Sequence, residues 1–98
     1  MLHTINKSPY ANSSLQSCLR FLQTEDVILL LEDGVYAASK GTSQSELIET
    51  ALQNNHAVYA IQADVKARGI DKLIEGVQLA DYNDFVKLLE EHRSNAWL

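Results

Sequence analysis

The sulfur chemistry that this chain could perform would depend on one residue, because Cys18 is its only cysteine. Reactive cysteines lie at helix N-termini or beside cations, which stabilise the thiolate. Leu15 and Leu22 flank Cys18 at helical spacing, which predicts that Cys18 lies in the middle of an amphipathic helix, on its apolar side. Free cysteine is among the residue types most often buried, so we interpret Cys18 as a packing residue rather than a catalytic nucleophile.

A second candidate for chemistry is Asp33, which stands next to Gly34 directly after a continuous apolar run. Asp33 could act as an active-site acid or bind a small ligand at that point. Asp-Gly is also an ordinary turn pair, used for its backbone conformation. We favour the turn, and keep a small-ligand site at Asp33 and Gly34 as a weaker hypothesis.

Metal, nucleotide and serine-nucleophile chemistry find no support in the spacing of residues. His3, His56 and His92 do not have the spacing of metal ligands such as His-x-x-x-His. The sequence also contains no Gly-rich dinucleotide fingerprint, no phosphate loop and no Gly-x-Ser-x-Gly nucleophile motif. We therefore expect no metal, no cofactor and no catalytic residue of these types, and an interaction role follows by elimination.

Length and charge narrow the class of protein further. With 98 residues, the chain is expected to form one domain over residues 1–98. Its net charge is −5, which argues against direct binding of nucleic acid, because phosphate neutralisation requires clustered cations. A lone cysteine and the absence of a secretory segment favour a cytoplasmic location. The longest apolar run, Val27 to Leu31, is far below the roughly 20 residues that span a bilayer.

The residues discussed above must be positioned by alternating strands and helices. Apolar runs predict strands at Leu2–Asn6, Val27–Leu31 and Ala57–Ile61, with a possible short strand at Val77–Ala80. Helical spacing predicts helices around Leu15–Leu22, Leu47–Leu52, Ala63–Arg68 and Tyr82–Leu89, and a helical turn at Val35–Ala38. This order indicates an α/β fold in which helices cover both faces of a mainly parallel sheet of four to five strands. Residues 95–98 are left as a tail.

Short polar motifs predict where three of these helices begin. Ser13 or Asn12 can cap the first helix, and Ser43 with Glu46 fits a capping box for the second. Asp81 with Asp84 can cap the last helix. In that helix the apolar residues at positions 82, 85, 86 and 89 predict a single inward face, with Lys87, Glu90 and Glu91 outward.

Several segments resemble the TusB/DsrH family, in order and over nearly the whole chain. They are His3-Thr4 with Ser8-Pro9, Leu29 to Val35 with Ala37-Ala38, Val58 to Ala60 leading to Ala67-Arg68-Gly69, Asp81-Tyr82 with Asp84 to Leu88, and the terminal Trp97. The resemblance implies a three-layer α/β/α, DsrEFH-like domain. It also implies a subunit of a sulfur-relay complex rather than an enzyme.

The family further implies partners and a pathway. TusB-type chains assemble with TusC-like and TusD-like paralogues in a heterohexamer with two copies of each. That complex takes persulfide sulfur from TusA and passes it toward TusE and the thiouridylase MnmA, for 2-thiolation of the tRNA wobble uridine in mnm5s2U synthesis. The resemblance places this chain in the complex without direct contact to nucleic acid or membrane.

In the family, the sulfur-carrying cysteine belongs to the TusD-like subunit, at the end of the strand that precedes the Arg-Gly segment. The corresponding place here is near Ile61 and Gln62, and neither residue has a thiol. The resemblance thus implies a non-catalytic partner. Some DsrH-type relatives carry a cysteine in the first part of the chain, so a sulfurtransferase or redox protein that uses Cys18 directly remains the alternative.

Contact residues for the paralogues are expected among apolar side chains that have no place in a helix stripe or strand. Aromatic anchors are frequent at the centre of interfaces. The candidates are Tyr10, Val35, Tyr36 and Trp97. Tyr10 and Trp97 could instead seal the ends of the core.

Overall fold

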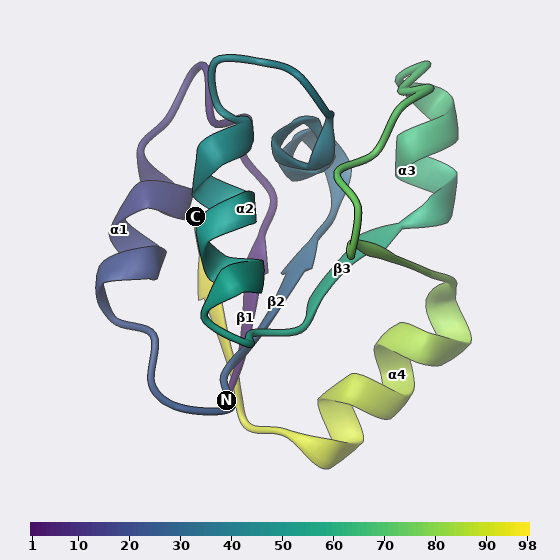
Figure 1. Ribbon diagram of the computed structural model, residues 1–98. Helices are drawn as coiled ribbons and strands as arrows, with labels where there is room; N and C mark the ends of the chain where they lie inside the picture. Colours follow the sequence, from purple (N-terminus) through teal and green to yellow (C-terminus); the bar gives the residue numbers. More distant parts are fainter.

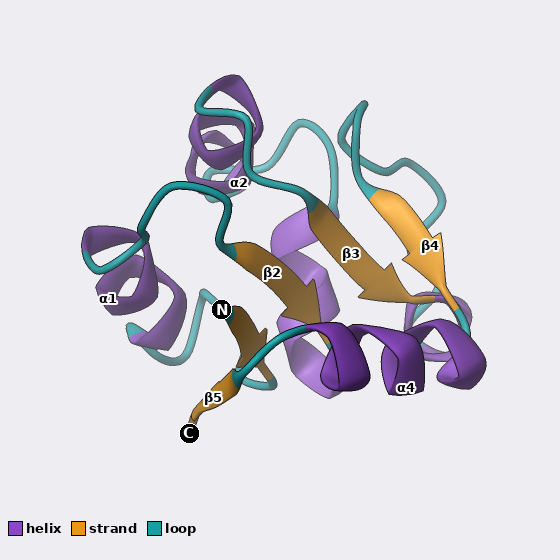
Figure 2. Cartoon of the chain, turned by 90° about the horizontal axis from the view of Figure 1, so that it is seen from below, coloured by secondary structure: helices purple, strands orange, loops and turns teal.

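The computed structural model describes residues 1–98 and places all strands in one parallel sheet of order β4-β3-β2-β1-β5 (Figures 1 and 2). The strands are β1 (Leu2–Ile5), β2 (Val27–Leu30), β3 (Val58–Ile61), β4 (Gln78–Ala80) and β5 (Ser94–Trp97). The predicted parallel sheet and its first four strands are confirmed. The segment left as a tail forms the fifth strand, which pairs with β1.

The helices follow the predicted order. They are α1 (Ser14–Arg20), the 3-10 helix η1 (Glu32–Ala38), α2 (Ser45–Gln53), α3 (Gln62–Ala67) and α4 (Tyr82–Glu91). The helical turn predicted at Val35–Ala38 is therefore the end of a longer 3-10 segment, which includes the turn residues Asp33 and Gly34.

The path of the chain decides which face of the sheet each helix covers. From β1 to β4 the strands are added in one direction, and the last connection then crosses back from β4 to β5. Parallel crossovers are right-handed, so a reversal of direction moves the connecting helix to the opposite face. Helix α4 accordingly lies alone on one face, while α1 and α2 lie on the other (Figure 2).

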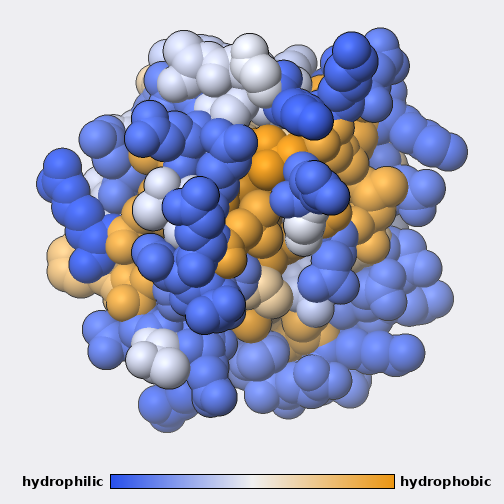
Figure 3. Space-filling view, viewed as in Figure 1, coloured by the Kyte–Doolittle hydropathy of each residue, from blue (hydrophilic) through white to orange (hydrophobic).

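The two faces consequently carry cores of different size. The larger core contains 14 buried residues and joins the sheet to α1, α2, α3 and η1. The smaller core contains 6 buried residues and includes a single residue of α4, Leu88. Strand β2 is buried along its whole length, as its continuous apolar sequence predicts. On the side of the larger core, a band of apolar atoms shows between α2 and α3, flanked by hydrophilic residues (Figure 3).

Helix α4 differs from the prediction in the direction of its apolar residues. Leu88 is buried and Phe85 half-buried, but Tyr82, Val86 and Leu89 are 65%, 51% and 43% exposed. The prediction of a single inward face was therefore wrong for these three side chains. The reason is geometric, because a lone helix on a sheet contacts it along one narrow side only, and the apolar sector of α4 is wider than that side.

The predicted helix caps have mixed outcomes. At α4, Asp81 and Asp84 form the predicted capping box: the backbone N–H of Asp84 donates to Asp81 at 2.8 Å, and that of Asp81 donates to Asp84 at 3.0 Å. The hydrogen bond from the Asp84 backbone lowers the pKa of Asp81. At α1, the Asn12 side chain, and not Ser13, accepts from the backbone N–H of Ser14 at 2.6 Å.

The capping box predicted for α2 is wrong. The helix begins at Ser45, after Ser43, and no side chain caps it. The Ser45 hydroxyl is buried instead, where it accepts from the backbone N–H of Thr42 at 2.8 Å and donates to the Ser39 carbonyl at 2.8 Å. These hydrogen bonds of Ser45 fix the turn before α2. The helix therefore begins at Ser45, and Ser43 does not cap it.

Candidate functional site

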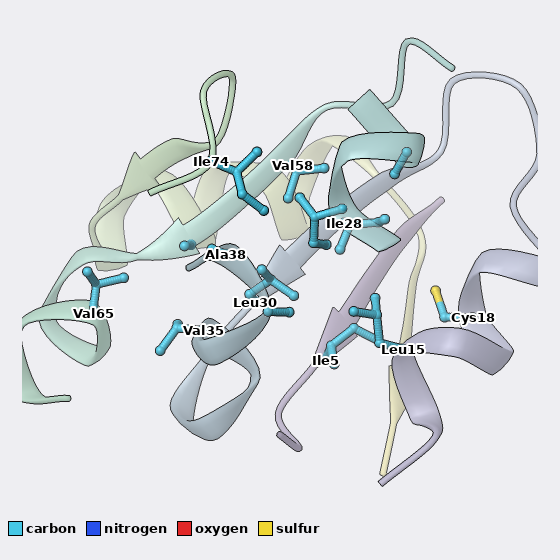
Figure 4. Packing of buried hydrophobic residues seen from close by; sticks show 14 residues of the cluster. Ile5, Leu15, Cys18, Ile28, Leu30, Val35, Ala38, Val58, Val65 and Ile74 are labelled. Carbon is cyan, nitrogen blue, oxygen red and sulfur yellow. The ribbon is translucent and has the colours of Figure 1, made fainter. Parts of the chain in front are cut away.

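Cys18 lies on α1 with no exposed surface, and its sulfur is part of the larger core beside Leu15 (Figure 4). The predicted mid-helix position on the apolar side is confirmed. Burial, and secondly the negative charge of Asp26, raise the pKa of the thiol to about 12. Because the thiolate is the nucleophile, a thiol with this pKa is unreactive at neutral pH. The position agrees with a packing role.

The carboxyl ends of β3 and β4 form a hollow of about 270 Å³ at the edge of the sheet where open parallel sheets bind ligands. Its lining comes from the end of β3 and the first turns of α3 and α4: Ile61, Gln62, Ala63, Lys66, Asp81 and Tyr82. We call this the carboxyl-edge hollow. It offers an amide, an ammonium, a carboxylate and a phenol, and no thiol, since the only cysteine lies in α1. These groups can bind a polar chain or side chain but cannot carry persulfide sulfur.

Asp33, the candidate acid, is held by ion pairs at the ends of β2 and β3. The Arg68 guanidinium donates to Asp33 at 2.9 Å and lies 3.6 Å from the Asp64 carboxylate. Asp64 in turn accepts from the backbone N–H of Glu32 at 2.8 Å. The three charged side chains join η1 to α3, which gives Asp33 a structural partner in the turn that we favoured.

A buried polar cluster that the sequence analysis did not predict lies on the β5 side of the sheet, where it links three strands. His3 of β1 and Asp26, just before β2, are 3% and 5% exposed, and His3 Nε2 lies 2.9 Å from Asp26 Oδ2. Trp97 Nε1 donates to His3 Nδ1 at 3.0 Å. An indole N–H can only donate, so His3 Nδ1 must be the acceptor. The ring proton of His3 is therefore on Nε2, which donates a hydrogen bond to Asp26. The chain Trp97–His3–Asp26 therefore ties β5 to β1 and to the start of β2.

Asp26 accepts two further hydrogen bonds. The backbone N–H of Gln23 donates to it at 3.0 Å, and the N-terminal ammonium of Met1 lies 3.0 Å from its other oxygen. Burial would raise the pKa of Asp26, but the hydrogen bonds from Gln23, His3 and the ammonium group outweigh burial and lower it to about 2. An apolar hollow of about 460 Å³ lies over this cluster, between Met1, Phe21 and Trp97. The buried polar side chains beneath it, His3 and Asp26, already have hydrogen-bond partners, which favours a structural role.

The four expected contact residues lie in different environments. Val35 is fully buried in the larger core, so the expectation that it contacts a partner is wrong; its place in η1 gives it a core position that the loop-like sequence did not show. Tyr36 and Trp97 are half-buried, and Trp97 also stacks on Phe21 at 6.0 Å. Tyr10 is 55% exposed. These three remain predicted contacts.

The exposed residues of α4, Tyr82, Val86 and Leu89, were missed as surface residues. Their spacing alone gives no direction, because an apolar stripe on a helix is ordinarily its buried side. The signal lies in the topology: a single crossover helix on its own face has too little neighbouring structure to cover a wide apolar sector.

Two further observations concern metal ligands and membrane spans. No group of three or more His, Cys, Asp or Glu side chains is placed so that it could hold a metal ion. None of the helices combines the length and the apolar character needed to cross a membrane.

Comparison with known proteins shows which family and which relatives the chain resembles. A family model described as DsrH like protein matches residues 7–95. Protein TusB of Pectobacterium atrosepticum is 39% identical and Protein TusB of Pectobacterium parmentieri 38% identical, each over 99% of this chain and 100% of the relative. The crystal structure of the ychN protein of E. coli has the same fold, with a TM-score of 0.81 at 19% identity, over 95% of this chain and 94% of that chain.

Proposed function

This chain belongs to the DsrH-like family, and from that membership we propose that it is a subunit of a sulfur-relay complex in the tRNA thiolation pathway. Full-length similarity to TusB proteins carries the proposal. The parallel sheet with helices on both faces is the fold that the family resemblance implied.

The composition of the complex is the finer part of the proposal. The chain assembles in the cytoplasm, as one domain, with a TusC-like and a TusD-like paralogue in a heterohexamer with two copies of each. TusA delivers sulfur to this complex, and TusE receives it for 2-thiolation of the wobble uridine. The net charge of −5 supports a subunit that serves tRNA modification without holding tRNA.

An accessory role for this chain is supported by the residues at the position where a paralogue carries its sulfur-transferring cysteine. The end of β3, where the TusD-like paralogue carries its cysteine, has Ile61 and Gln62 here, beside a hollow without a thiol. Cys18 is buried in α1 with a pKa raised to about 12. We therefore assign the persulfide to the paralogue and a structural, non-catalytic role to this chain.

Co-expression with a TusC-like and a TusD-like paralogue is expected to yield a stable hetero-oligomer, because the chain leaves apolar side chains exposed that a partner can cover. Native mass spectrometry of the purified complex measures the mass and stoichiometry directly. The chain expressed alone is the control. A chain that stays monomeric beside both folded paralogues would contradict the proposal.

Cys18→Ala separates the accessory role from direct use of the thiol. In cells that rely on this chain, we expect unchanged 2-thiouridine in tRNA, measured by mass spectrometry of digested nucleosides. The small buried cavity should lower the free energy of unfolding by roughly 1 kcal/mol. Loss of 2-thiouridine with the variant still folded and assembled would show that Cys18 takes part in transfer.

A further inference from the structure

Three exposed apolar side chains of α4 form a continuous stripe along one side of the helix. Tyr82, Val86 and Leu89 occupy positions i, i+4 and i+7, which share one side of a helix. We call these three residues the α4 stripe. Apolar residues scattered singly on a surface are common, but three at helical spacing in a helix of 10 residues form a patch.

No other element of the chain is placed to cover this stripe. Helix α4 is alone on its face of the sheet, and Leu88 with the half-buried Phe85 already supplies its contact with the strands (Figure 2). Tyr82 is the most exposed of the three, and tyrosine is enriched among residues that dominate binding energy in interfaces. The stripe therefore has the composition of an interface centre.

Charges around α4 indicate what kind of surface could cover the stripe. Two carboxylates lie beside the stripe: Asp81 at the start of the helix, and Glu90 one turn after Val86. The other charged groups of the helix, Asp84, Lys87 and Glu91, line a hollow with Tyr59 on the opposite side of the helix. Packing against a second copy would bring carboxylates together in either direction. Antiparallel helices place Asp81 of one copy against Glu90 of the other, and parallel helices place each of these two acids against its own counterpart. Like charges across an interface are unfavourable, so a second copy does not fit.

The stripe also adjoins the carboxyl-edge hollow, because Tyr82 lines both. A partner seated on the α4 stripe would therefore lie next to the end of β3. This is the edge of the sheet at which the proposed complex carries out sulfur transfer in its TusD-like subunit. Docking here would bring a neighbouring subunit to the edge of the sheet that lacks a thiol in this chain.

We propose that the α4 stripe is the docking surface for a paralogous subunit whose contact patch has an apolar centre and a rim of Lys or Arg side chains. This inference rests on the proposed function, which supplies the paralogues as partners. The apolar centre would bury Tyr82, Val86 and Leu89, and the basic rim would pair with the carboxylates of Asp81 and Glu90.

The test combines an apolar and a charge-reversing variant in the co-expressed complex. Tyr82→Ser with Val86→Ser is expected to weaken assembly by roughly tenfold or more, because truncation of central interface residues has effects of that size. Leu79→Ser is the matched control, since Leu79 is 46% exposed, close to the 51% of Val86, but lies on β4 outside the stripe. Thermal unfolding of each isolated chain checks that these exposed changes leave the fold intact.

Glu90→Lys tests the basic rim. We expect several-fold weaker assembly at low salt and a smaller loss at high salt, where charges are screened. Glu46→Lys on the exposed side of α2 is the control of equal charge change. Analytical ultracentrifugation over a concentration series measures the dissociation constants.

The possible outcomes distinguish this proposal from the proposed function. If the unaltered chain does not assemble with its paralogues, the proposed function fails, and the assigned occupant fails with it. If the unaltered chain assembles and the stripe variants assemble with the same affinity, or Leu79→Ser weakens assembly equally, only the docking surface is overturned. Self-association of the chain that the stripe variants abolish would show a second copy as the occupant and also overturn the proposal.

Discussion

Gly34→Ala is expected to destabilise the protein by more than about 3 kcal/mol, a large fraction of the stability of a small domain. A Cβ atom on Gly34 would lie 2.1 Å from the carbonyl oxygen of Ile5 and 2.8 Å from its carbonyl carbon. Both are backbone atoms of β1, a strand paired on each side, by β2 and β5. The same Ile5 oxygen accepts a hydrogen bond from the backbone N–H of Leu31 at 3.0 Å, so η1 cannot move away without breaking the end of the sheet.

Urea unfolding of the variant, followed by circular dichroism, measures the effect. Gly41→Ala is the matched control, because a Cβ there meets nothing within 4 Å and only its φ of +77° opposes alanine. We expect that control to cost about 1 kcal/mol. Equal midpoints for the two variants would mean that η1 does not approach β1 as closely as the structure has it.

The elements that the sequence predicts well are those in which local chemistry and final environment agree. The run Val27 to Leu31 predicts a strand buried on both sides, and β2 has that environment because helices cover both faces of the central sheet. The Asp81 and Asp84 pair predicts the start of α4, since both partners of a capping box lie within one turn. Such features need no knowledge of distant segments.

The features that escaped prediction depend on contacts between distant segments. The first three residues of strand β5 are polar or small, and its strand character comes from pairing with β1 at the other end of the chain. The direction of the α4 stripe depends on the order of the strands, which no local pattern contains. Val35, expected at a contact surface, is buried because η1 folds onto the larger core.

The polar cluster of Asp26, His3 and Trp97 shows the same limit at the level of side chains. Its hydrogen bonds join residues separated by 23 and 94 positions in the chain. Each of them has an ordinary local explanation, Asp26 as a turn residue and Trp97 as the end of a tail. Only the sheet order, with β1 between β2 and β5, brings them together, and their burial makes each dependent on the others.

Asp26→Ala is expected to lower the free energy of unfolding by roughly 3 kcal/mol, because it leaves a buried donor and a part-buried donor without an acceptor. His3 Nε2 and the backbone N–H of Gln23 would both lose their partner, and the orientation of His3 toward Trp97 would be lost with it. Asp33→Ala is the control, because its ion pair with Arg68 involves a carboxylate that is 60% exposed. Exposed pairs contribute at most about 1 kcal/mol, so thermal unfolding should separate the two variants clearly.

The pH dependence of the free energy of unfolding measures what the charge of Asp26 contributes, separately from the size of its side chain. Hydrogen bonds lower the pKa of Asp26 to about 2, against 3.8 for the unperturbed side chain in the unfolded chain. The unfolded state therefore takes up the proton first as pH falls, so the contribution of Asp26 is complete above about pH 4 and is lost toward pH 2. The difference corresponds to roughly 2 kcal/mol.

Asp26→Asn keeps the size of the side chain but cannot titrate, so urea unfolding between pH 5 and pH 2 should show the unaltered protein losing about 2 kcal/mol more than the variant. Parallel curves for the two proteins would mean that the Asp26 carboxylate is not preferentially stabilised in the folded state, and that Trp97 and His3 hold β5 to β1 without help from its charge.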